Sequence, residues 1–547
     1  MTPALQSTFR PARWLGVVLV LVALGASLMR AAVPEDERRR QTEVAELLGR
    51  TRLLELLQEQ QSLTAEEQEV LPQLQAFVKR ECPEYFSQVM QPYLQRSLTA
   101  LIADPARRNE LEAARRVIRG MRIPRPAEWT DLVARNPLPP ADPAGLKPGQ
   151  SGLWMMVVWG SWSQTGQGRA WGVVDPSLTT DDRRRLRALS RTFDRNALDP
   201  AKLAALAKAA GCDGVVLVTR HLDGVPLFAE KQISEGGKAK LDGPLTHLVS
   251  GIRAQGLKVG LYYCLASSRH ADSNWWPYHP NYVPGMIQAF PDRWKRYELE
   301  CLSDLQWLVA GYQPDILWTD ERWPAQGSDR LWRFFEATRR RNPNLQLSDR
   351  GTGEFANFVT PDERALKEAL PGAWHMVAAV SKGPGSWYRS TPNTGFKDAY
   401  ECIRLFVECR GAGGNLTLSV GPDGQGAIPA EEEMAFRDLG QWLEGPGKAL
   451  RAGATPLAFE LQPKWGKSFQ TKEGQVTFVY GPEARKAAEG KLTIAIPNPP
   501  KRVRLTGDKA GDGPLIQFEY DARAGVCRIA TDAVPSGRVV SALRIEF

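Results

Sequence analysis

The sequence is poor in the residues that build metal centres and disulfide frameworks. Its 547 residues contain seven cysteines, an odd number without any CxxC pair, and five histidines without HxH or HExxH spacing. A disulfide framework and a zinc site are therefore not expected. The GxGxxG turn of dinucleotide-binding folds is also absent from the sequence. The sequence predicts neither a metal nor a cofactor.

The charge balance does not favour nucleic acid as a partner. Seventy basic residues stand against 62 acidic ones, which leaves a net charge of +8. Basic clusters at 38–40, 183–185 and 339–341 are flanked by acidic or polar residues, as on solvated helix faces, and lack a pattern of stacking aromatic residues. With 43% hydrophobic residues and 17 tryptophans, the chain is expected to form a large packed core over about three or four domains.

An uncharged apolar run at 14–29 follows Arg10 and Arg13 and precedes Arg30. The run is short for a membrane span of about 20 residues and fits the apolar region of a secretory signal. We therefore predict that residues 1–32 form a signal peptide and that the body of the protein is exported to the periplasm or the cell exterior. The alternative is an uncleaved anchor that attaches the protein to a membrane through residues 14–29.

Composition divides the rest of the chain into four parts. Residues 33–122 are almost free of glycine, with apolar residues at helical spacing, and predict a helical region. Seven prolines fall within the predicted linker at 123–150. A larger domain is expected at 151–450, and alternating runs at 491–496, 503–505 and 516–520 predict a small all-β sandwich domain at 451–547.

The region 151–450 alternates short apolar runs with helical stretches. Seven such runs are found, at 153–158, 214–218, 258–263, 314–318, 345–347, 376–380 and 416–420. Their spacing predicts an α/β fold with a parallel sheet. Aromatic and polar residues follow several runs, as in the active sites of (β/α)8 barrels. The predicted fold is a (β/α)8 TIM-like barrel with an N-terminal helical region and a C-terminal all-β sandwich domain.

Carboxylates follow two neighbouring strands of this predicted barrel. Asp320 ends the apolar run ILWTD, and Asp362 and Glu363 follow in FVTPDER, with Glu354 as a further acid. Two carboxylates above a tryptophan-rich floor suit hydrolysis of a sugar, because one can attack the ring while the other protonates the leaving oxygen. The competing interpretation of Asp320 is a helix N-cap, a common role of an aspartate after a strand.

Several segments resemble those of a known family. PAKLAALAKAAGCDGVVLVTRHLDGVPLF is similar to a helix and strand that end in Lys-His-His-(Asp/Glu)-Gly-Phe, GLKVGLYYCLA to a Tyr-Tyr-Ser strand, and DILWTDERW to a nucleophile strand. QLSDRG and the long GAGGNLTLSVGPDGQGAIP match two further signatures, and VVSALRIEF resembles a closing β-sandwich strand. Over roughly residues 150–545 the chain resembles glycoside hydrolase family 29, the retaining α-L-fucosidases.

The resemblance implies roles for individual residues. Asp320 matches the nucleophile, Arg350 the active-site arginine and His221 the first of two paired histidines. Further sugar contacts are implied for Trp159, Trp171, Tyr263 and Trp318.

The general acid implied by the resemblance has two candidates. The family's Phe-x-Thr-x-Glu pattern aligns with Phe358, Thr360 and Asp362, so an aspartate stands where a glutamate is usual, and Glu363 follows it. An aspartate is one methylene shorter, and retaining pairs of carboxylates lie about 5–5.5 Å apart. Either Asp362 or Glu363 remains a candidate.

The sequence departs from the family at three sugar-binding positions. Val158, Leu222 and Ala170 stand where the resemblance implies hydrogen-bonding groups in the family. The implied function is a retaining α-L-fucosidase-like hydrolase that removes terminal α-linked fucose, or a related sugar, from glycans. The alternative is a catalytically weakened carbohydrate-binding protein on the same scaffold. In both cases the partner is a glycan, and the sequence does not fix an oligomeric state.

Overall fold

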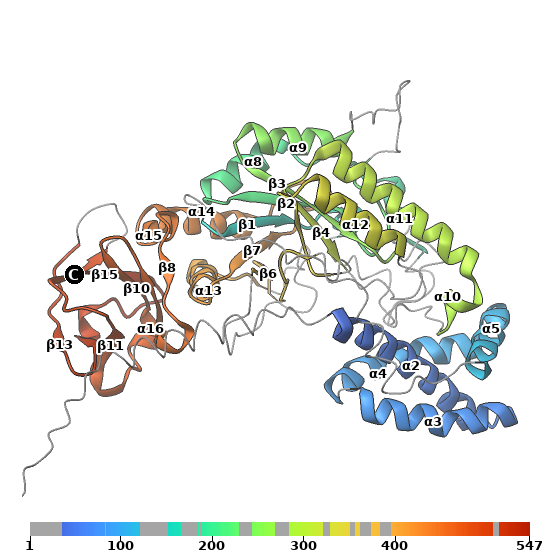
Figure 1. Cartoon of the computed structure of the whole chain (residues 1–547). Coiled ribbons are helices and arrows are strands. Elements are labelled where there is room, and N and C mark those ends of the chain that lie inside the picture. The colour runs from blue at the N-terminus through green and yellow to red at the C-terminus, as the bar shows by residue number, and fades with distance from the viewer. Residues whose placement is uncertain are drawn as a thin grey trace, which may run out of the picture.

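A computed structural model describes residues 35–82, 84–120, 151–165, 184–185, 188–228, 243–267, 284–320, 329–350, 356–361, 373–382, 395–506 and 513–547. These residues form an N-terminal helical unit, a central α/β unit and a C-terminal unit of antiparallel sheets (Figure 1). Among them, no helix combines the length and the apolar character needed to cross a bilayer. The predicted signal peptide, the alternative anchor and the whole of the predicted linker at 123–150 fall outside the described residues.

The helical unit consists of α2 (Glu35–Glu59), α3 (Ala65–Glu81), α4 (Glu84–Ala103) and α5 (Arg108–Arg119), within the predicted helical region. Leucines from these helices form its core, and Leu54, Leu74 and Leu98 are fully buried. Thr64 caps α3 through a reciprocal capping box with Glu67, which satisfies free N–H groups at the start of the helix. The same Glu67 carboxylate pairs with Arg115, so that α3 and α5 are joined by a buried ion pair.

The central unit is built on a curled sheet of seven parallel strands. The strands are β1 (Leu153–Val157), β2 (Gly214–Arg220), β3 (Lys258–Cys264), β4 (Ile316–Asp320), β5 (Gln346–Leu347), β6 (His375–Ala379) and β7 (Asn415–Val420), and each lies in one of the seven predicted runs or overlaps it. Their order in the sheet is β5-β4-β3-β2-β1-β7-β6. Two isolated parallel bridges, Ser348 to Phe358 and Val359 to Trp374, extend from the two edges of this sheet to the same short segment.

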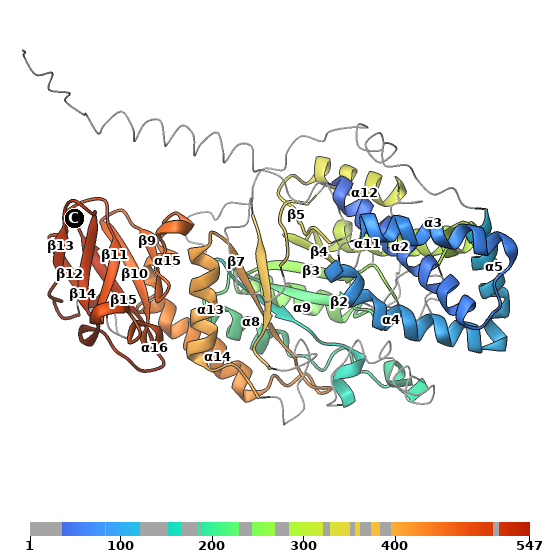
Figure 2. The ribbon, with the colours of Figure 1, turned by 90° about the horizontal axis from the view of Figure 1, so that it is seen from below.

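Helices cover the outer face of the curled sheet (Figures 1 and 2). They are α8 (Pro200–Ala209), α9 (Pro244–Ala254), α11 (Pro291–Tyr312), α12 (Asp329–Arg341), α13 (Ala399–Gly411) and α14 (Ala430–Glu444). Asp199 caps α8, and Asp398 forms a capping box at the start of α13. Each helix is amphipathic and turns its apolar residues toward the strands, which buries the outward-facing side chains of the sheet.

Strand alternation sorts the side chains of the sheet into two cores. Val216, Val218, Tyr262 and Trp318 belong to the core on the concave side of the sheet. The intervening residues, such as Leu217, belong to the core beneath the helices. Because successive residues of a strand point to opposite faces, this parity decides which side chains can reach the site at the strand ends.

The C-terminal unit has a five-stranded sheet and a three-stranded sheet. In the order β12-β15-β10-β9-β8, the first contains β8 (Thr455–Pro456), β9 (Gly466–Gln470), β10 (Gly474–Tyr480), β12 (Arg502–Thr506) and β15 (Val540–Glu546). The second, in the order β11-β14-β13, contains β11 (Lys491–Ala495), β13 (Glu519–Asp521) and β14 (Val526–Ala530). Apolar residues from both sheets, including Leu492, Ile494, Val503 and Leu543, share one core. The indole of Trp442 in α14 donates to the Val540 carbonyl of β15 over 2.8 Å and joins this unit to the central one.

The helical unit docks on α10 (Met286–Ala289), a short helix between β3 and α11 (Figure 1). Met286 is only 3% exposed and lies in the core of the helical unit, with Phe290 packed against that core. The backbone N–H of Gly285 donates to the Glu46 carboxylate of α2. Since α10 follows the carboxyl end of β3, the helical unit lies on the side of the sheet where Asp320 ends β4.

Candidate active site

Asp320 is the last residue of β4, and two donors hold its carboxylate. The Tyr262 hydroxyl donates to Oδ2 over 2.5 Å, and Arg350 Nη1 donates to Oδ1 over 3.0 Å. The Asp320 side chain is 15% exposed. A carboxylate has about four lone-pair positions and can accept more than two hydrogen bonds.

The surroundings of Asp320 favour its ionised form. Burial alone would raise the pKa of this carboxyl, but the Arg350 charge, the Tyr262 hydrogen bond and His221 outweigh burial. The pKa of Asp320 is therefore lowered from its ordinary value, and the group is a carboxylate at neutral pH. An ionised carboxylate at the end of a strand can act as a nucleophile or stabilise a positive charge on a substrate.

His221 lies directly after β2 and faces Tyr262. The two rings stack with centroids 5.4 Å apart, and the Trp162 ring contacts His221 edge-on at 5.7 Å. Burial lowers the pKa of His221 to about 4, although the charge of Asp320 acts in the opposite direction. The Leu222 backbone N–H donates to Nδ1 over 2.8 Å, so the proton of the neutral ring is on Nε2. His221 is therefore a neutral hydrogen-bond donor through Nε2 at physiological pH.

Arg350 is held by segment 356–361, which pairs with both edges of the sheet through Phe358 and Val359. Its Nε donates to Thr360 Oγ1 over 2.9 Å and its Nη2 to the Thr360 carbonyl over 3.1 Å. The Thr360 hydroxyl in turn donates to Asp349 Oδ1 over 2.7 Å. On the other side, the Thr319 hydroxyl donates to the Arg350 carbonyl. These contacts orient the guanidinium toward Asp320 independently of the ion pair itself.

A bulge in β2 determines that His221 faces the concave side. Val218 pairs with Tyr262, but Arg220 pairs with the next residue, Tyr263, so Thr219 is an extra residue in β2. The Thr219 hydroxyl donates to the Tyr262 carbonyl over 2.6 Å. One extra residue reverses the alternation of a strand. As a result, Arg220 points toward the helices and His221 toward Asp320.

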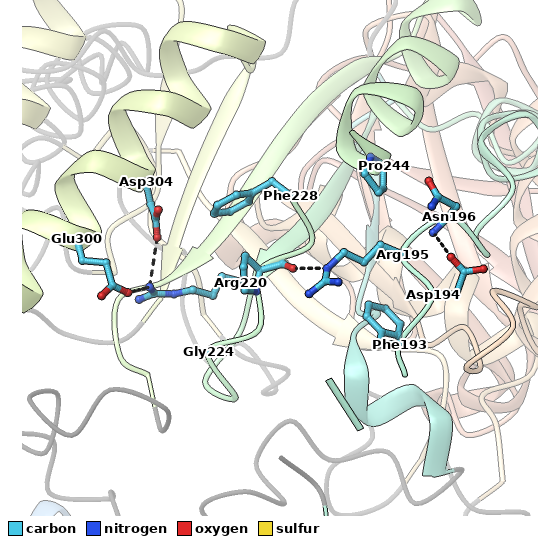
Figure 3. Close-up of a pocket in the computed structure, with 11 residues that line it drawn as sticks. Phe193, Asp194, Arg195, Asn196, Arg220, Gly224, Phe228, Pro244, Glu300 and Asp304 are labelled. Atoms are coloured by element: carbon cyan, nitrogen blue, oxygen red, sulfur yellow. Dashed lines mark hydrogen bonds and ion pairs between the residues drawn. The ribbon is translucent and has the colours of Figure 1, made fainter. Parts of the chain in front are cut away.

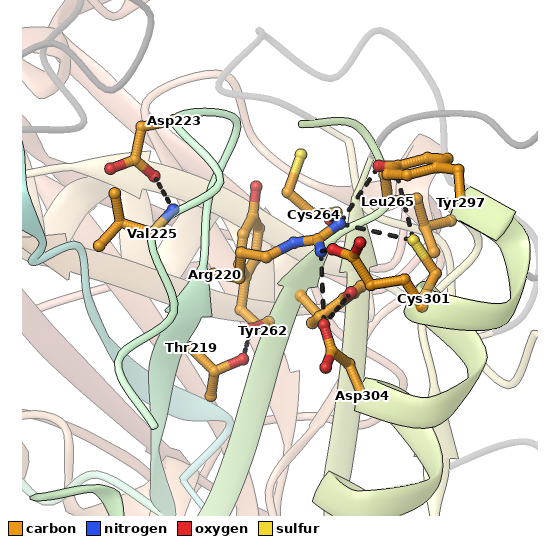
Figure 4. A network of polar contacts seen from close by, with 12 residues as sticks. Thr219, Arg220, Asp223, Val225, Tyr262, Cys264, Leu265, Tyr297, Cys301 and Asp304 are labelled. Carbon is orange, nitrogen blue, oxygen red and sulfur yellow. Dashed lines mark hydrogen bonds and ion pairs between the residues drawn. The ribbon is translucent and has the colours of Figure 1, made fainter. Parts of the chain in front are cut away.

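Arg220 is the centre of a buried polar network on the helix side (Figure 4). Its guanidinium lies 4.3 Å from the centroid of the Tyr263 ring and pairs with Asp304 of α11 at 3.4 Å. Nη2 donates to the Cys264 carbonyl over 3.1 Å and contacts the Tyr297 hydroxyl. The network ties the end of β3 to α11, behind the strand ends that carry Tyr262 and Asp320.

Two predicted sugar contacts lie elsewhere than the sequence suggested. Tyr263 is fully buried on the helix side, where its hydroxyl donates to Asp304 over 2.7 Å, whereas Tyr262 contacts Asp320. The Trp159 indole packs on Phe193 on the helix side and donates to a backbone carbonyl over 2.8 Å. Both assignments are corrected by strand parity, because each side chain is one residue out of phase with the concave face.

Trp318 does lie on the concave face, deep below Asp320. It is 1% exposed and packs edge-on against Phe358 and His375, with centroids 5.4 and 6.0 Å apart. Trp318 forms the floor of the site.

The structure brings together Asp320, His221 and Arg350 above Trp318. The other predicted site residues fall outside the described residues, namely Trp171, Asp362 and Glu363, as do the further acid Glu354 and Ala170.

Apolar side chains occupy two of the positions for which the sequence resemblance implied polar groups. Val158 and Leu222 are 3% and 1% exposed and belong to the same concave core as Trp162 and Trp318. Neither side chain offers a hydrogen bond to a sugar hydroxyl.

Sequence reasoning gave no individual site role to three residues that shape the site, namely Tyr262, Thr360 and Asp349. Tyr262 could have been found from parity, since it is level with Trp318 in the register of β3 and β4. Thr360 and Asp349 act through Arg350, and their pairing depends on a contact between loops. Among the described residues, no cluster of three or more His, Cys, Asp or Glu side chains is arranged to hold a metal ion.

Comparisons with known proteins agree on one family. A family model described as alpha-L-fucosidase matches residues 170–448, about half of the chain. The plasma alpha-L-fucosidase of Rattus norvegicus is 27% identical over 264 residues, and this match spans 45% of the chain but only 54% of the rat protein. The chain therefore spans about half the length of this curated relative.

Solved structures extend the likeness to the fold. Alpha-L-fucosidase isoenzyme 1 from Paenibacillus thiaminolyticus superposes with a TM-score of 0.58 at 20% identity, over 73% of this chain and 97% of that one. The alpha-fucosidase of Thermotoga maritima in complex with fucose gives 0.56 at 21% identity, over 73% and 96%. At such identities the likeness concerns the fold.

Proposed function

Because the chain belongs to the α-L-fucosidase family of glycosidases, we propose that it is a retaining hydrolase that removes terminal α-linked fucose, or a related sugar, from glycans through a covalent glycosyl-aspartate. The observation that carries the proposal is Asp320, a carboxylate kept ionised at the end of β4 by Arg350 and Tyr262. A closed (β/α)8 ring with 358–359 as its eighth strand, and export of the protein, belong to the same proposal.

In the first step the Asp320 carboxylate attacks the anomeric carbon while the glycosidic bond breaks. The leaving oxygen takes a proton from a general acid. In the second step the general acid, now ionised, acts as a base and accepts a proton from water. The water oxygen attacks the anomeric carbon and releases Asp320. His221 donates through Nε2 to a sugar oxygen, and Arg350 orients the nucleophile.

Asp362 and Glu363 are the proposed general acids. They follow Thr360, which contacts Arg350 directly. Two or three residues of chain span at most about 7–11 Å, which allows either carboxyl to approach the pair spacing of about 5–5.5 Å found in retaining enzymes.

The nucleophile is tested with Asp320→Gly and Asp320→Asn on an aryl α-L-fucoside. Each variant is expected to lose on the order of 10⁴-fold or more of the turnover while keeping its circular dichroism spectrum. Azide should partly restore turnover of the glycine variant, because a small anion fits the vacated space and attacks the sugar. NMR of the first product of the unmodified enzyme should show the α-anomer. Unchanged turnover in the variants, or a β-anomer as the first product, overturns the proposal.

The general acid is tested with Asp362→Ala and Glu363→Ala on a series of aryl fucosides. The variant that lacks the acid should lose most activity on substrates with poor leaving groups and little on activated ones, which leave without a proton. The other variant is the matched control. If neither shows this dependence, Glu354 becomes the candidate.

A carbohydrate-binding protein of weak or no activity is the second candidate function. It is favoured by Val158 and Leu222, whose buried apolar side chains replace hydrogen-bonding groups. A site without these partners loses about 1 kcal/mol or more for each missing bond. Calorimetry with L-fucose distinguishes the candidates: saccharide binding without turnover of any aryl glycoside identifies a binding protein.

A further inference from the structure

A cavity of about 670 Å³ lies away from Asp320, on the helix side of the loop that follows β2 (Figure 3). Its walls come from segment 193–196 ahead of α8, from the β2 loop, from the start of α9 at Pro244, and from Glu300 and Asp304 of α11. Its size falls in the range of about 300–1,000 Å³ that is typical of small-molecule sites. Neither Tyr262 nor Arg350, which donate to Asp320, is among the residues that line this cavity.

The cavity has an exposed rim and a buried floor. Asp194 and Asn196 are exposed at the rim. Arg220 at the floor is 3% exposed, and the Phe193 and Phe228 rings are 5% and 4% exposed. Apolar ring surface beside a few convergent polar groups is the usual composition of a ligand pocket.

The charges of the lining side chains largely cancel. Arg220 is paired with Glu300 and with Asp304 at 3.4 Å each. Arg195 donates through Nε to the Pro226 carbonyl over 2.9 Å. Three carboxylates stand against two guanidinium groups in the lining, so the cavity carries little net charge. It offers both donors and acceptors, which is what hydroxyl groups require.

One donor at the floor has no acceptor. The Nε–H of Arg220 is buried and has no hydrogen-bond partner. Buried polar groups in native proteins are nearly always paired with protein, water or ligand. The described residues therefore do not saturate the hydrogen-bonding capacity of Arg220 beside the floor of the cavity.

We propose that this cavity binds a neutral saccharide unit outside the catalytic centre, between the Phe193 and Phe228 rings and the Arg220 floor. The choice of a saccharide rests on the proposed function, because a glycan-processing protein meets polyhydroxylated ligands. The apolar face of the sugar packs on the rings, and its hydroxyls bond to the guanidinium, carboxylate and amide groups.

The test is calorimetric titration of the full-length Asp320→Asn protein with lactose, which lacks the α-linked fucose that the proposed catalytic site takes. Asn196→Trp, which fills the rim, should weaken binding of lactose tenfold or more, and Glu300→Gln should weaken it less. Asn498→Trp, at an exposed position of the C-terminal unit, is the matched control and should bind as the parent does. In the background with Asp320 intact, Asn196→Trp should cleave a small aryl fucoside within twofold of the parent rate.

The outcomes separate this site from the catalytic one. Lactose binding that survives Asn196→Trp, absence of lactose binding, or binding of inorganic phosphate in its place overturns the cavity proposal. Loss of aryl fucoside cleavage in Asn196→Trp also overturns it, because the cavity would then belong to the catalytic site. Saccharide binding lost in Asn196→Trp, together with no turnover by the unmodified protein, refutes the proposed hydrolase and leaves the cavity site standing.

Discussion

The neighbouring tyrosines of β3 allow a sharp test of the electrostatics at Asp320. The Tyr262 hydroxyl donates to the Asp320 carboxylate, while the Tyr263 hydroxyl donates to Asp304 on the other face of the sheet. Phenylalanine at either position removes one hydroxyl and keeps the ring. The two variants therefore differ only in which carboxylate loses a donor.

A hydrogen bond to a charged group contributes about 1.5–3 kcal/mol, and one pKa unit corresponds to about 1.4 kcal/mol. Tyr262→Phe should therefore raise the pKa of Asp320 by about one to two units. Because the nucleophile must be ionised, the acid limb of kcat/KM moves to higher pH by the same amount, and activity falls on the acid side. Tyr263→Phe should leave the acid limb in place and lower the melting temperature, since buried Asp304 loses a donor.

The assay is the pH profile of kcat/KM on an activated aryl fucoside, measured from about pH 3 to pH 8. Substrates with poor leaving groups would add the titration of the general acid to the profile. The activated substrate therefore isolates the titration of the nucleophile. An equal shift in both variants, or no shift in Tyr262→Phe, would refute the argument that the Tyr262 hydroxyl keeps Asp320 ionised.

Three further predictions concern stability. Burial raises the pKa of Glu432 to about 8, so stability should fall by up to about 1.4 kcal/mol per unit as pH rises from about 5 to 8, and Glu432→Gln should flatten this slope in urea titrations. Arg220→Met, which leaves Asp304 buried without its ion pair, should cost about 3–5 kcal/mol in the same titrations; a cost below about 1 kcal/mol contradicts the network. Met286→Ala should cost about 2–5 kcal/mol of docking of the helical unit, seen as an earlier calorimetric transition that the exposed Met434→Ala control lacks.

The apolar runs of the central unit were sufficient to predict its seven strands. Each run is short, bounded by turn or helix signals, and buried on both faces, which is the sequence signature of a parallel sheet. The position of Asp320 at a strand end followed directly, because its carboxylate comes right after such a run. His221 and Arg350 were named from the family resemblance, and both contribute to the lowered pKa of Asp320.

Side-chain direction was the part that sequence reasoning did not obtain. The Tyr262–Tyr263 pair cannot be assigned by residue type, and only the register with Trp318 separates the two. The bulge at Thr219 could not be seen in the apolar pattern at all, because a bulge depends on pairing with β3. The partners of Arg220 are equally remote, since Asp304 lies 84 positions further along the chain.

The geometry around Arg350 also bears on the second half of the proposed reaction. When Asp320 becomes an ester, it loses its negative charge, and the ion pair with Arg350 loses most of its strength. His221, with its pKa lowered to about 4 by burial, carries no charge that would replace it. Thr360 then holds the guanidinium through Nε and Nη2, and its hydroxyl is oriented for this by Asp349. Arg350 therefore stays in place to receive the carboxylate when water cleaves the ester.

Thr360→Val, which removes the hydroxyl but keeps the carbonyl, should slow this hydrolysis more than it slows attack by Asp320. Burst kinetics with an activated aryl fucoside measure the two steps separately. A variant that slows only the burst, with its steady-state rate unchanged, would contradict this role of Thr360.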